Sequence, residues 1–546
     1  MNGTMKLLSL FKHSRKYISI KLQAPRTVLR GKYGLWINGT TVDPGRAYID
    51  VTYPHDHTQI VSQVVNASVE HVDDAVNAAW TSFHKEKTWR NMDVRDRSTI
   101  LMNCGKLLRE RISDFAKMEV LQTGRPIREM NAQLQRLPEW FEYYGSLIRT
   151  AEDRVLPFKG ANFLNYVTRE PLGVCVLLTA WNHPLLLSIK KISVALATGN
   201  SVICKPSELA PCSIYELAHL MQKADFFFFF YHLWQYLNFF FFKKKKSAYE
   251  RAAADQQQNQ QNRFDRRPGD IQENQTHQQQ KYNLLRYTAE LGGKSPMIVF
   301  DDIALDKAIN GCAFGAFIAS GQTCIMGSRI LVQDKCYDEF VKKFVEKVQE
   351  MTKRMGDPMN PDTQLGPLIS MSHRDKVHEK VKAALADNPK CTLLCGGNLL
   401  DKTLGKRNKG SYYEPTVIAN VTSDMTIFKE EIFGPVVVIT RFTDEEHAIA
   451  LANDGAYGLA ASVWTENLGR AHRVSRALDC GIVWVNDHHK NDPCSPFGGF
   501  KNSGIGRENG IDAFLEYTQS KSTIINFGTQ SSDWFASNPS ANVRYS

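Results

Sequence analysis

The stretch that decides the fold runs from Val174 to Pro206 and reads VCVLLTAWNHPLLLSIKKISVALATGNSVICKP. Its hydrophobic pattern predicts a strand, a loop, a helix and a second strand, at 174–178, 179–184, 185–197 and 201–205. Two strands joined through a helix form a parallel pair, and parallel sheets bind ligands at the carboxyl ends of their strands. Asn182, Lys205 and Glu208 follow the ends of these strands. The sequence therefore predicts a binding site at this edge.

The same alternation of strands and helices continues along most of the chain. Strands are expected near 47–52, 59–65, 329–333, 415–419, 435–441, 481–485 and 520–527. Helices are expected near 69–85, 93–120, 127–150, 210–224, 337–355, 370–387, 444–453 and 467–478. The chain has 546 residues, of which 43% are hydrophobic, and this length is sufficient for about two to four domains with buried cores. The pattern predicts an α/β fold.

A second stretch, Phe317-Ile-Ala-Ser-Gly-Gln-Thr-Cys324, has the features of a shielded nucleophile. Small neighbours allow a carbonyl group to approach the sulfur, and backbone N–H groups can face the oxygen that becomes charged. Glu290 lies 34 residues earlier, beside a Gly-Gly pair where the backbone can turn tightly. Taken alone, Cys324 also fits a small core residue, and Glu290 also fits a loop charge. Together they predict a thiol nucleophile with a carboxylate base.

These two boxes, Glu290-Leu-Gly-Gly-Lys and Gly321-Gln-Thr-Cys324, resemble the active-site signatures of the NAD(P)-dependent aldehyde dehydrogenase superfamily. The resemblance covers about 35–224 and 282–530. It includes EEIFGP at 430–435 and PFGGFKNSGIGRE at 496–508. Each string alone would be an unremarkable turn, but their order and spacing match the family.

The resemblance implies the division of the chain. A Rossmann-type NAD-binding domain is expected over 35–152 and 172–290, followed by an α/β catalytic domain over 291–517. A small β element for oligomerisation is expected from 153–171 and 518–530, and it implies a homodimer or homotetramer. A basic arm over 1–34 and a tail over 531–546 remain outside these domains.

The resemblance also implies a reaction. The Cys324 thiolate attacks an aldehyde to give a thiohemiacetal, hydride passes to NAD, and Glu290 activates the water that hydrolyses the resulting thioester. The Asn182 amide and the Cys324 backbone N–H are expected to hold the oxyanion. The product is a carboxylic acid.

Further family positions imply the cofactor contacts. Lys205 and Glu208 are expected to hold the adenosine ribose, where a carboxylate repels a 2′-phosphate and favours NAD over NADP. Glu431 is expected to hold the nicotinamide ribose, with Trp181 and Phe433 as apolar neighbours.

An apolar, aromatic-tolerant substrate tunnel is expected from Trp140, Tyr143, Tyr144, His183, Phe317 and Phe497. The aromatic residues at 140–144 fit a helix in the core as well as they fit a pocket. The Trp-Asn-His-Pro loop is similar to members that act on betaine-type or aromatic aldehydes. The sequence leaves the aldehyde itself open.

The family pattern fails over about 225–281. Runs of phenylalanine and lysine and a Gln/Asn-rich tract replace the expected Gly-x-Thr-x-x-Gly turn, and Gly269 is the only glycine between Ala224 and Leu291. A membrane-inserting loop, an insertion beside an intact motif and a mis-spliced or mis-predicted segment are the three interpretations, and the repetitive composition favours the last. The alternative function is a catalytically impaired member, with at most thiol esterase activity or a structural role.

Composition and charge limit the partners, metal sites and compartments that are expected for this chain. The formal charge is +10, but no basic patch is interleaved with aromatic residues, so no nucleic-acid partner is expected. Eleven cysteines without a Cys-x-x-Cys pair indicate reduced thiols inside a cell and no metal site. Residues 1–42 contain no Asp or Glu, which fits either an organellar transit peptide or a basic tail. A cytoplasmic location is expected, with the mitochondrial matrix as the alternative and no membrane partner.

Overall fold

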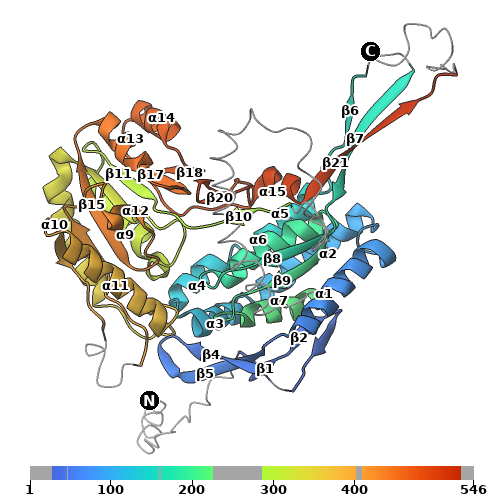
Figure 1. The fold of residues 1–546 in the computed structure, drawn as a ribbon, viewed down its shortest axis with the longest axis horizontal. Helices are drawn as coiled ribbons and strands as arrows, with labels where there is room; N and C mark the ends of the chain where they lie inside the picture. Colours follow the sequence, from blue (N-terminus) through green and yellow to red (C-terminus); the bar gives the residue numbers. More distant parts are fainter. Residues whose placement is uncertain (1–27, 46, 159–161, 225–285, 401–408, 530–546) are drawn as a thin grey trace, which may run out of the picture.

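The computed structural model describes residues 28–45, 47–158, 162–224, 286–400 and 409–529. Most of the basic arm, all of the anomalous segment at 225–281 and the tail therefore lie outside the described residues. Figure 1 shows two lobes and a narrow β arm that extends from one of them. Among the described helices, none is both long and apolar enough to cross a membrane.

The first lobe is built around the β–α–β unit predicted at 174–206. Strands β8 (Val174–Leu178) and β9 (Ser201–Lys205) pair in parallel, and α6 (Pro184–Ala197) connects them. The other helices of this lobe are α1 (Val69–Thr81), α2 (Val94–Glu110), α3 (Ile112–Thr123), α4 (Ile127–Leu134), α5 (Pro138–Leu147) and α7 (Cys212–Lys223). Helices α2 to α7 share one large hydrophobic core with β4 (Tyr48–Tyr53) and β5 (Asp56–Val65), whereas α1 packs in a separate, smaller cluster.

Three helices expected as single elements are interrupted. The helix expected over 93–120 breaks at Arg111, whose φ of −113° and ψ of 11° are not helical. The helix expected over 127–150 breaks before Pro138, which begins α5 because proline lacks the N–H that a helix interior requires. The helix expected over 69–85 continues as a π-helical turn (Ser82–Glu86) that ends at Lys87, with φ of 56°. The hydrophobic pattern continues through each break, and Pro138 was the one sequence signal that would have marked a boundary.

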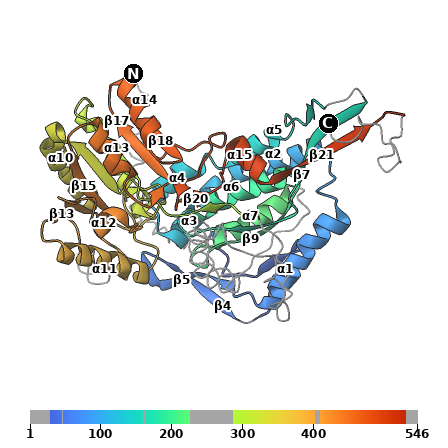
Figure 2. The same cartoon turned by 45° about the horizontal axis from the view of Figure 1, so that its top comes forward.

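The second lobe contains a seven-stranded sheet in the order β13-β14-β15-β12-β11-β17-β18, in which only β13 is antiparallel to its neighbour. Its strands are β11 (Pro296–Val299), β12 (Arg329–Gln333), β13 (Thr392–Cys395), β14 (Thr416–Ala419), β15 (Val436–Phe442), β17 (Ala460–Trp464) and β18 (Ile482–Val485). Its helices are α9 (Leu305–Phe317), α10 (Asp334–Thr352), α11 (Met371–Asp387), α12 (Thr426–Lys429), α13 (Glu445–Asn453) and α14 (Leu468–Ala477). Figures 1 and 2 show these helices on both sides of the sheet.

Short strand pairs join the remaining segments. They are β1 (Lys32–Tyr33) with β5, β2 (Leu35–Ile37) with β3 (Thr40–Val42), β10 (Ala289–Glu290) with β20 (Gly504–Ile505), and β16 (Tyr457–Gly458) with β19 (Phe500–Lys501). The pair of β10 and β20 brings residues more than 200 positions apart together at the junction of the lobes. Helix α15 (Gly510–Glu516) then returns the chain to the first lobe.

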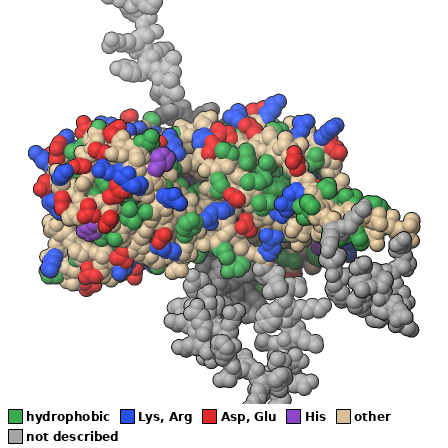
Figure 3. All heavy atoms as spheres, turned by 90° about the horizontal axis from the view of Figure 1, so that it is seen from above, with side chains coloured by type: hydrophobic (Ala, Val, Ile, Leu, Met, Phe, Trp, Pro, Cys, Tyr) green, Lys and Arg blue, Asp and Glu red, His purple; other side chains and the backbone are tan. Residues whose placement is uncertain are grey.

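The arm is a three-stranded antiparallel sheet of β6 (Arg154–Leu156), β7 (Phe163–Pro171) and β21 (Thr518–Asn526). β21 pairs with β7 over its whole length, from Thr518 opposite Pro171 to Asn526 opposite Phe163. Figure 3 shows acidic and basic side chains mixed over the second lobe, and hydrophobic side chains gathered nearer the arm.

Candidate active site

Cys324 lies just beyond the end of α9, after a short 3-10 turn (Ile318–Gly321). Ala319 and Ser320 in this turn have left-handed backbone conformations, with φ of 54° and 53°, which cost about 1–3 kcal/mol each for residues other than glycine. Packing imposes this shape, because a Cβ atom on the glycine that ends the turn would lie 2.3 Å from the carbonyl oxygen of Gly434. A strained turn held from outside is typical of a functional site.

A short strand and a glycine pair bring Glu290 to the cysteine. Glu290 lies in β10, opposite Gly504 of β20. The chain then passes so close to the nucleophile that a Cβ atom on Gly293 would lie 2.4 Å from the carbonyl oxygen of Cys324. Because any side chain would overlap this backbone, only glycine permits the approach. The Gly-Gly pair after Glu290 therefore sets the segment that carries Glu290 against the segment that carries Cys324.

The carboxyl group of Glu290 is largely removed from water. Its Oε2 atom is buried and makes no hydrogen bond to the described residues. Burial raises the pKa of Glu290 to about 7, although Lys191, Lys190 and Arg507 act in the opposite direction. A carboxylate with a pKa near neutrality is suited to accept a proton from a thiol or from water.

The thiol of Cys324 rests in its protonated form. Burial raises the pKa of Cys324 to about 12, with contributions in the same direction from Glu290 and Glu431 and an opposing one from Lys190. Because the thiolate is the nucleophile, a base must take the proton when the thiol reacts. The geometry of the Gly-Gly pair offers Glu290 for this role.

The loop between β8 and α6 brings Asn182 to the same turn. The Nδ2 atom of Asn182 donates a hydrogen bond to the carbonyl oxygen of Gln322 over 3.0 Å. The Gln322 side chain in turn donates to the carbonyl of Ala319 and accepts from the backbone N–H of Ile369. This network fixes a side-chain amide beside the nucleophile, which is the kind of donor that stabilises an oxyanion.

Two lysines and a glutamate supply further charge, and sequence reasoning missed all three. Lys190 and Lys191 project from α6, and Lys191 forms an ion pair with Glu508. The Nζ atom of Lys190 lies 3.9 Å from Glu508 Oε2, and these side chains are 2% and 7% exposed. Lysine is almost never fully buried without a partner. Two lysines inside the otherwise apolar helix predicted over 185–197 therefore indicate buried charges with a partner, and this signal was present in the sequence.

Trp181, Glu431 and Phe433 gather on another side of Cys324. The rings of Trp181 and Phe433 meet edge to face at 5.4 Å. Glu431 Oε1 accepts a hydrogen bond from the backbone N–H of Gly293 over 3.0 Å, and burial raises the pKa of this carboxyl group. A Cβ atom on the preceding glycine would lie 2.2 Å from Glu431 Oε2, so both glycines leave room that the carboxylate uses.

His373, in the first turn of α11, completes this aromatic group. Its ring lies 5.5 Å from that of Trp181, and its Nε2 atom is 2.7 Å from the carbonyl oxygen of Phe433. Nothing in the sequence near His373 indicated this position, because it follows from packing between distant segments.

Lys205 and Glu208 lie at the carboxyl end of β9. Lys205 is opposite Leu178 in the register of the sheet, so it shares one sheet edge with the loop that carries Trp181. The Nζ atom of Lys205 donates to the carbonyl of Pro206 over 3.2 Å, and Ser207 donates to Glu208 Oε2 over 3.1 Å. Burial lowers the pKa of Lys205. This edge carries both an ammonium and a carboxylate group.

Three residues expected in a substrate tunnel are packed inside the lobes. Trp140 donates from Nε1 to Asn509 over 2.9 Å, and the Tyr144 hydroxyl donates to the carbonyl of Gly510 over 3.4 Å. Both belong to the core of the first lobe. Phe317 is fully buried in the second lobe, where its ring stacks on Phe344 at 6.3 Å.

The other three expected tunnel residues differ in their surroundings. Phe497 packs in a small cluster against Cys324. His183 is buried, with its Nδ1 atom 2.7 Å from the guanidinium of Arg125, and burial lowers its pKa well below the ordinary value. Tyr143 is partly buried on α5 and lies edge to face with Tyr144 at 5.0 Å.

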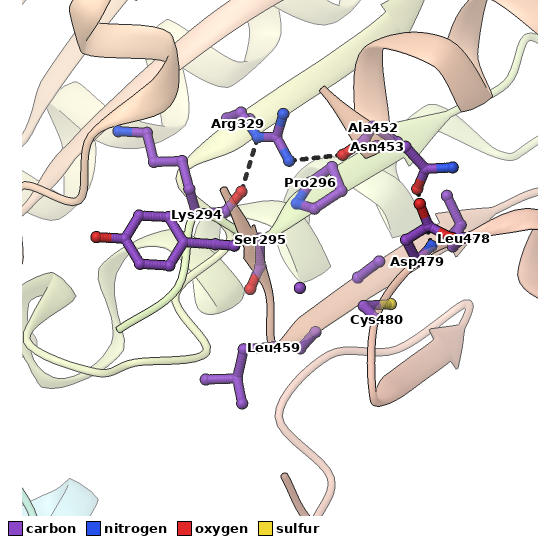
Figure 4. Close-up of a pocket in the computed structure, with 14 residues that line it drawn as sticks. Lys294, Ser295, Pro296, Arg329, Ala452, Asn453, Leu459, Leu478, Asp479 and Cys480 are labelled. Carbon is purple, nitrogen blue, oxygen red and sulfur yellow. Dashed lines mark hydrogen bonds between the residues drawn. The ribbon is translucent and has the colours of Figure 1, made fainter. Parts of the chain in front are cut away.

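A narrow crevice behind the glycine pair is structural. Figure 4 shows Arg329 at the upper side of this crevice, and its guanidinium donates to the carbonyl of Lys294 over 2.7 Å and to that of Ala452 over 2.8 Å. Its guanidinium also donates to the carbonyls of Leu451 and Asp454, each over 3.0 Å. These bonds fix the segment after Glu290 to the end of α13.

Comparisons with known proteins agree with this geometry. The sequence profile described as "Aldehyde dehydrogenase family" matches residues 41–226 and 272–523. An aldehyde dehydrogenase of Davidiella tassiana is 38% identical over 518 residues, which cover 93% of this chain and 99% of the relative.

Solved structures give the same result. A betaine aldehyde dehydrogenase of Staphylococcus aureus in complex with NAD+ superposes with a TM-score of 0.82 at 29% identity, over 93% of this chain and 97% of that chain. An NAD-dependent aldehyde dehydrogenase of Sinorhizobium meliloti superposes with a TM-score of 0.83 at 31% identity, over 94% and 98%. The chain belongs to the aldehyde dehydrogenase family.

Proposed function

We propose that this protein oxidises an aldehyde to a carboxylic acid with NAD+ as the hydride acceptor. One observation carries the proposal. The glycine pair after Glu290 packs against the Cys324 backbone and the Glu431 carboxylate, and Glu290, whose pKa is raised by burial, acts electrostatically on the Cys324 thiol. A nucleophile, its base and a polar contact for a cofactor sugar thus share one site.

The described residues fit NAD+ along the carboxyl ends of β8 and β9. Lys205 and Glu208 would hold the adenosine ribose, and the Glu208 carboxylate disfavours a 2′-phosphate, so NAD+ is preferred to NADP+. Glu431 would hold the nicotinamide ribose, with Trp181 and Phe433 as its apolar neighbours. When bound, NAD+ takes up the hydride that leaves the aldehyde carbon. The family's pyrophosphate turn corresponds to 225–281, outside the described residues.

The protein's own residues perform the acyl chemistry. Glu290 accepts the proton of Cys324, and the sulfur forms a bond to the aldehyde carbon. The resulting oxyanion is held by the Asn182 side-chain amide and the Cys324 backbone N–H. After hydride loss the carbon is a thioester. Glu290 passes the thiol proton to solvent and then takes a proton from the attacking water. The hydroxide displaces the sulfur and releases the acid, and Glu290 returns its proton to the Cys324 sulfur.

For the substrate tunnel we propose Phe497, Tyr143 and His183. Phe497 belongs to the cluster against which Cys324 packs. His183 follows Asn182 in the chain, and Tyr143 lies near Asp492 and Cys494, on the segment before Phe497. We place Trp140, Tyr144 and Phe317 behind the tunnel, because Trp140 and Tyr144 pack in the large core of the first lobe and Phe317 packs in a core of the second.

We also propose a homodimer or homotetramer formed through the arm. Along β21 and just beyond it, Ile524, Ile525 and Phe527 are 51%, 42% and 60% exposed, and an exposed strand of this kind is usually covered by a partner. Light scattering with size-exclusion chromatography should give a mass of at least two chains. A monomer would contradict this proposal.

We place the protein in the cytoplasm, with the mitochondrial matrix as the alternative. All eleven cysteines are free thiols, as expected for a reducing compartment. Fractionation of cells that express the full chain separates the two locations, since import removes the basic arm and shortens the protein.

The proposed function is tested with purified protein, NAD+ and a panel of aliphatic and aromatic aldehydes. NADH formation is expected with wild-type protein and is expected to be lost in Cys324→Ala. The matched control is Cys494→Ala, which removes an exposed cysteine and should leave the rate unchanged. Failure of the wild type to form NADH with any aldehyde would contradict the proposal.

The second candidate is an impaired member of the family, which the sequence between Ala224 and Leu291 favours because it lacks the Gly-x-Thr-x-x-Gly turn. If the transcript encodes this segment as written, NAD+ titration should show little binding, while activated-ester hydrolysis persists and disappears in Cys324→Ala. Sequencing the transcript across codons 220–285 decides between the two functions. A spliced message that restores the turn supports the dehydrogenase.

A further inference from the structure

The proposed reaction assigns no role to the ammonium group of Lys190. Lys190 lies in the middle of α6, and its side chain is 2% exposed. Its Nζ atom is 3.9 Å from Glu508 Oε2, which is longer than a hydrogen bond. It is also 3.9 Å from the centre of the Phe497 ring, which is a close cation–π contact.

The nearby carboxyl groups do not balance this charge. Glu508 forms its close ion pair with Lys191 rather than with Lys190. Burial lowers the pKa of Lys190 and of Lys191 to about 8, while Glu290 acts in the opposite direction. At pH 7 both lysines therefore still hold their proton, whereas burial raises the pKa of Glu290 to about 7 and leaves it only partly ionised. When Glu290 holds a proton, two ammonium groups face one carboxylate. The ammonium group of Lys190 then gives the site a net positive charge.

Phe497 links this charge to the nucleophile. Phe497 belongs to the small hydrophobic cluster against which Cys324 packs, and the Lys190 ammonium lies over one face of its ring. Proteins bind quaternary ammonium ligands on aromatic faces, through the same cation–π attraction. In this chain a lysine already occupies the aromatic face beside the thiol.

We propose that Lys190 sets the charge preference of the aldehyde site, so that it rejects aldehydes bearing a quaternary ammonium group and favours those bearing a carboxylate. The proposal rests on the proposed function, because it specifies the substrate of the same thiol. It also distinguishes this chain from the structurally similar betaine aldehyde dehydrogenase of Staphylococcus aureus, whose named substrate is cationic. The reaction at the aldehyde carbon is unchanged, and the preference concerns only the charged group at the other end of the aldehyde.

The first test reads the thiol directly and requires neither NAD+ nor turnover. Two methanethiosulfonates of similar size, one carrying a sulfonate and one carrying a trimethylammonium group, each transfer a thioalkyl group to Cys324 and release methanesulfinate. Rates at Cys324 are followed by peptide mass spectrometry, and exposed Cys494 in the same chain is the internal control. Relative to Cys494, wild-type Cys324 should prefer the anionic reagent by roughly tenfold or more.

Variants of Lys190 assign the preference to one group. Lys190→Met keeps the length of the side chain and removes the charge, so the anion-to-cation ratio at Cys324 should approach that of Cys494. Lys190→Arg keeps the charge and should keep the ratio, and Lys190→Gln replaces the methionine variant if that protein does not fold. The ratio cancels any change in the thiolate fraction, because both reagents consume the same thiolate. A wild-type ratio equal to that of Cys494, or one unchanged in the neutral variants, overturns the proposal.

The second test compares kcat/KM for three aldehydes of similar size that differ in charge. They are 4-oxobutanoate, which is anionic, butanal, which is neutral, and betaine aldehyde, which is cationic. Wild type should favour 4-oxobutanoate over betaine aldehyde by at least about tenfold, and Lys190→Met should reduce this ratio while butanal changes by less than about threefold. Equal use of all three aldehydes overturns the charge preference and leaves the dehydrogenase intact. If no aldehyde is oxidised but the ratio of the two reagents at Cys324 still depends on charge, the proposed dehydrogenase function is overturned and the charge preference stands.

Discussion

The side-chain amide of Asn182 donates a hydrogen bond to the backbone carbonyl of Gln322 over 3.0 Å, which joins the loop after β8 to the turn that presents Cys324. An amide NH2 group has two hydrogens, so a bond made by one of them also fixes the direction of the other. The protein itself therefore sets the direction of the second N–H of Asn182. Preorganised donors are among the largest contributions to catalysis, because no reorganisation is needed when charge develops.

Replacing Asn182 by alanine should reduce kcat by about 10²–10³-fold, the usual effect of removing one oxyanion donor. KM should change little, since the interaction forms with the charged intermediate and not with the neutral aldehyde. Steady-state NADH formation measures both constants. The closest control is Asn182→Gln, which keeps the amide but moves it by one methylene and should also be slow. A loss of less than about threefold in the alanine variant would remove Asn182 from the oxyanion site.

The activity should depend on the protonation of Glu290. Burial raises its pKa from 4.5 to about 7, and the base works only when deprotonated, so kcat should fall as pH decreases through about 7 and not through 4.5. In Glu290→Gln this limb should be absent and the residual rate low. A pH–rate profile in buffers of constant ionic strength checks the assignment. A wild-type limb near 4.5 would contradict it.

The same carboxyl group should also leave a signature in stability. In the folded protein Glu290 keeps its proton up to about pH 7, whereas in the unfolded chain it loses the proton near 4.5. The stability that this group contributes is therefore complete below pH 4.5 and is lost as pH rises toward 7. Glu290→Gln should become relatively more stable than wild type across this range, as denaturant titrations at pH 4.5 and 7 can show. A constant difference between the two proteins would indicate an ordinary, unburied glutamate.

Gly293→Ala should damage both folding and activity. The new Cβ atom would lie 2.4 Å from the Cys324 carbonyl oxygen, with Leu459 Cβ at 3.2 Å, and backbone atoms cannot yield as a flexible side chain can. Overpacking of this kind costs about 1–3 kcal/mol, and any relief must displace the nucleophile. Thermal unfolding and NADH formation are the measurements. Gly31→Ala is the control, because no atom lies within 4 Å of its added methyl group, and equal behaviour of the two variants would refute the packing argument.

Arg329→Met should destabilise the second lobe by about 3 kcal/mol or more. The buried guanidinium donates to four backbone carbonyls, and its removal leaves these acceptors without their partner. Arg109→Met is a suitable comparison, because Arg109 forms an exposed ion pair with Glu142, which should contribute no more than about 1 kcal/mol. Urea unfolding compares the variants. Similar losses would show that burial of Arg329 does not matter.

Much of the architecture was predictable because it is encoded locally. The strand expected at 329–333 is β12 to the residue, and the helix expected at 370–387 begins one residue later as α11. The family assignment rested on short strings with fixed spacing, and the comparisons confirm it. The breaks at Arg111 and Pro138 were missed, since the hydrophobic period of α2 and α5 continues through them.

The site was predictable only where the family has a motif. Cys324, Glu290 and Glu431 stand in such strings, and the structure brings them together, although their roles stay predictions. Lys190 and Glu508 come from segments more than 300 residues apart, and their encounter depends on how the lobes pack. Aromatic spacing on α5 could not separate a core residue from a pocket residue, because both require the same buried face.

The last part of the chain completes its first lobe. β21 closes the arm against β7, and Phe514 of α15 packs in the core formed by residues near the beginning of the chain. During synthesis on the ribosome the amino-terminal lobe would therefore wait for the carboxyl-terminal segment, although domains usually fold in the order in which they are made. A messenger RNA truncated before the codon for Gly510 would thus yield a chain that lacks its carboxyl-terminal segment but whose packing defect lies in the amino-terminal lobe.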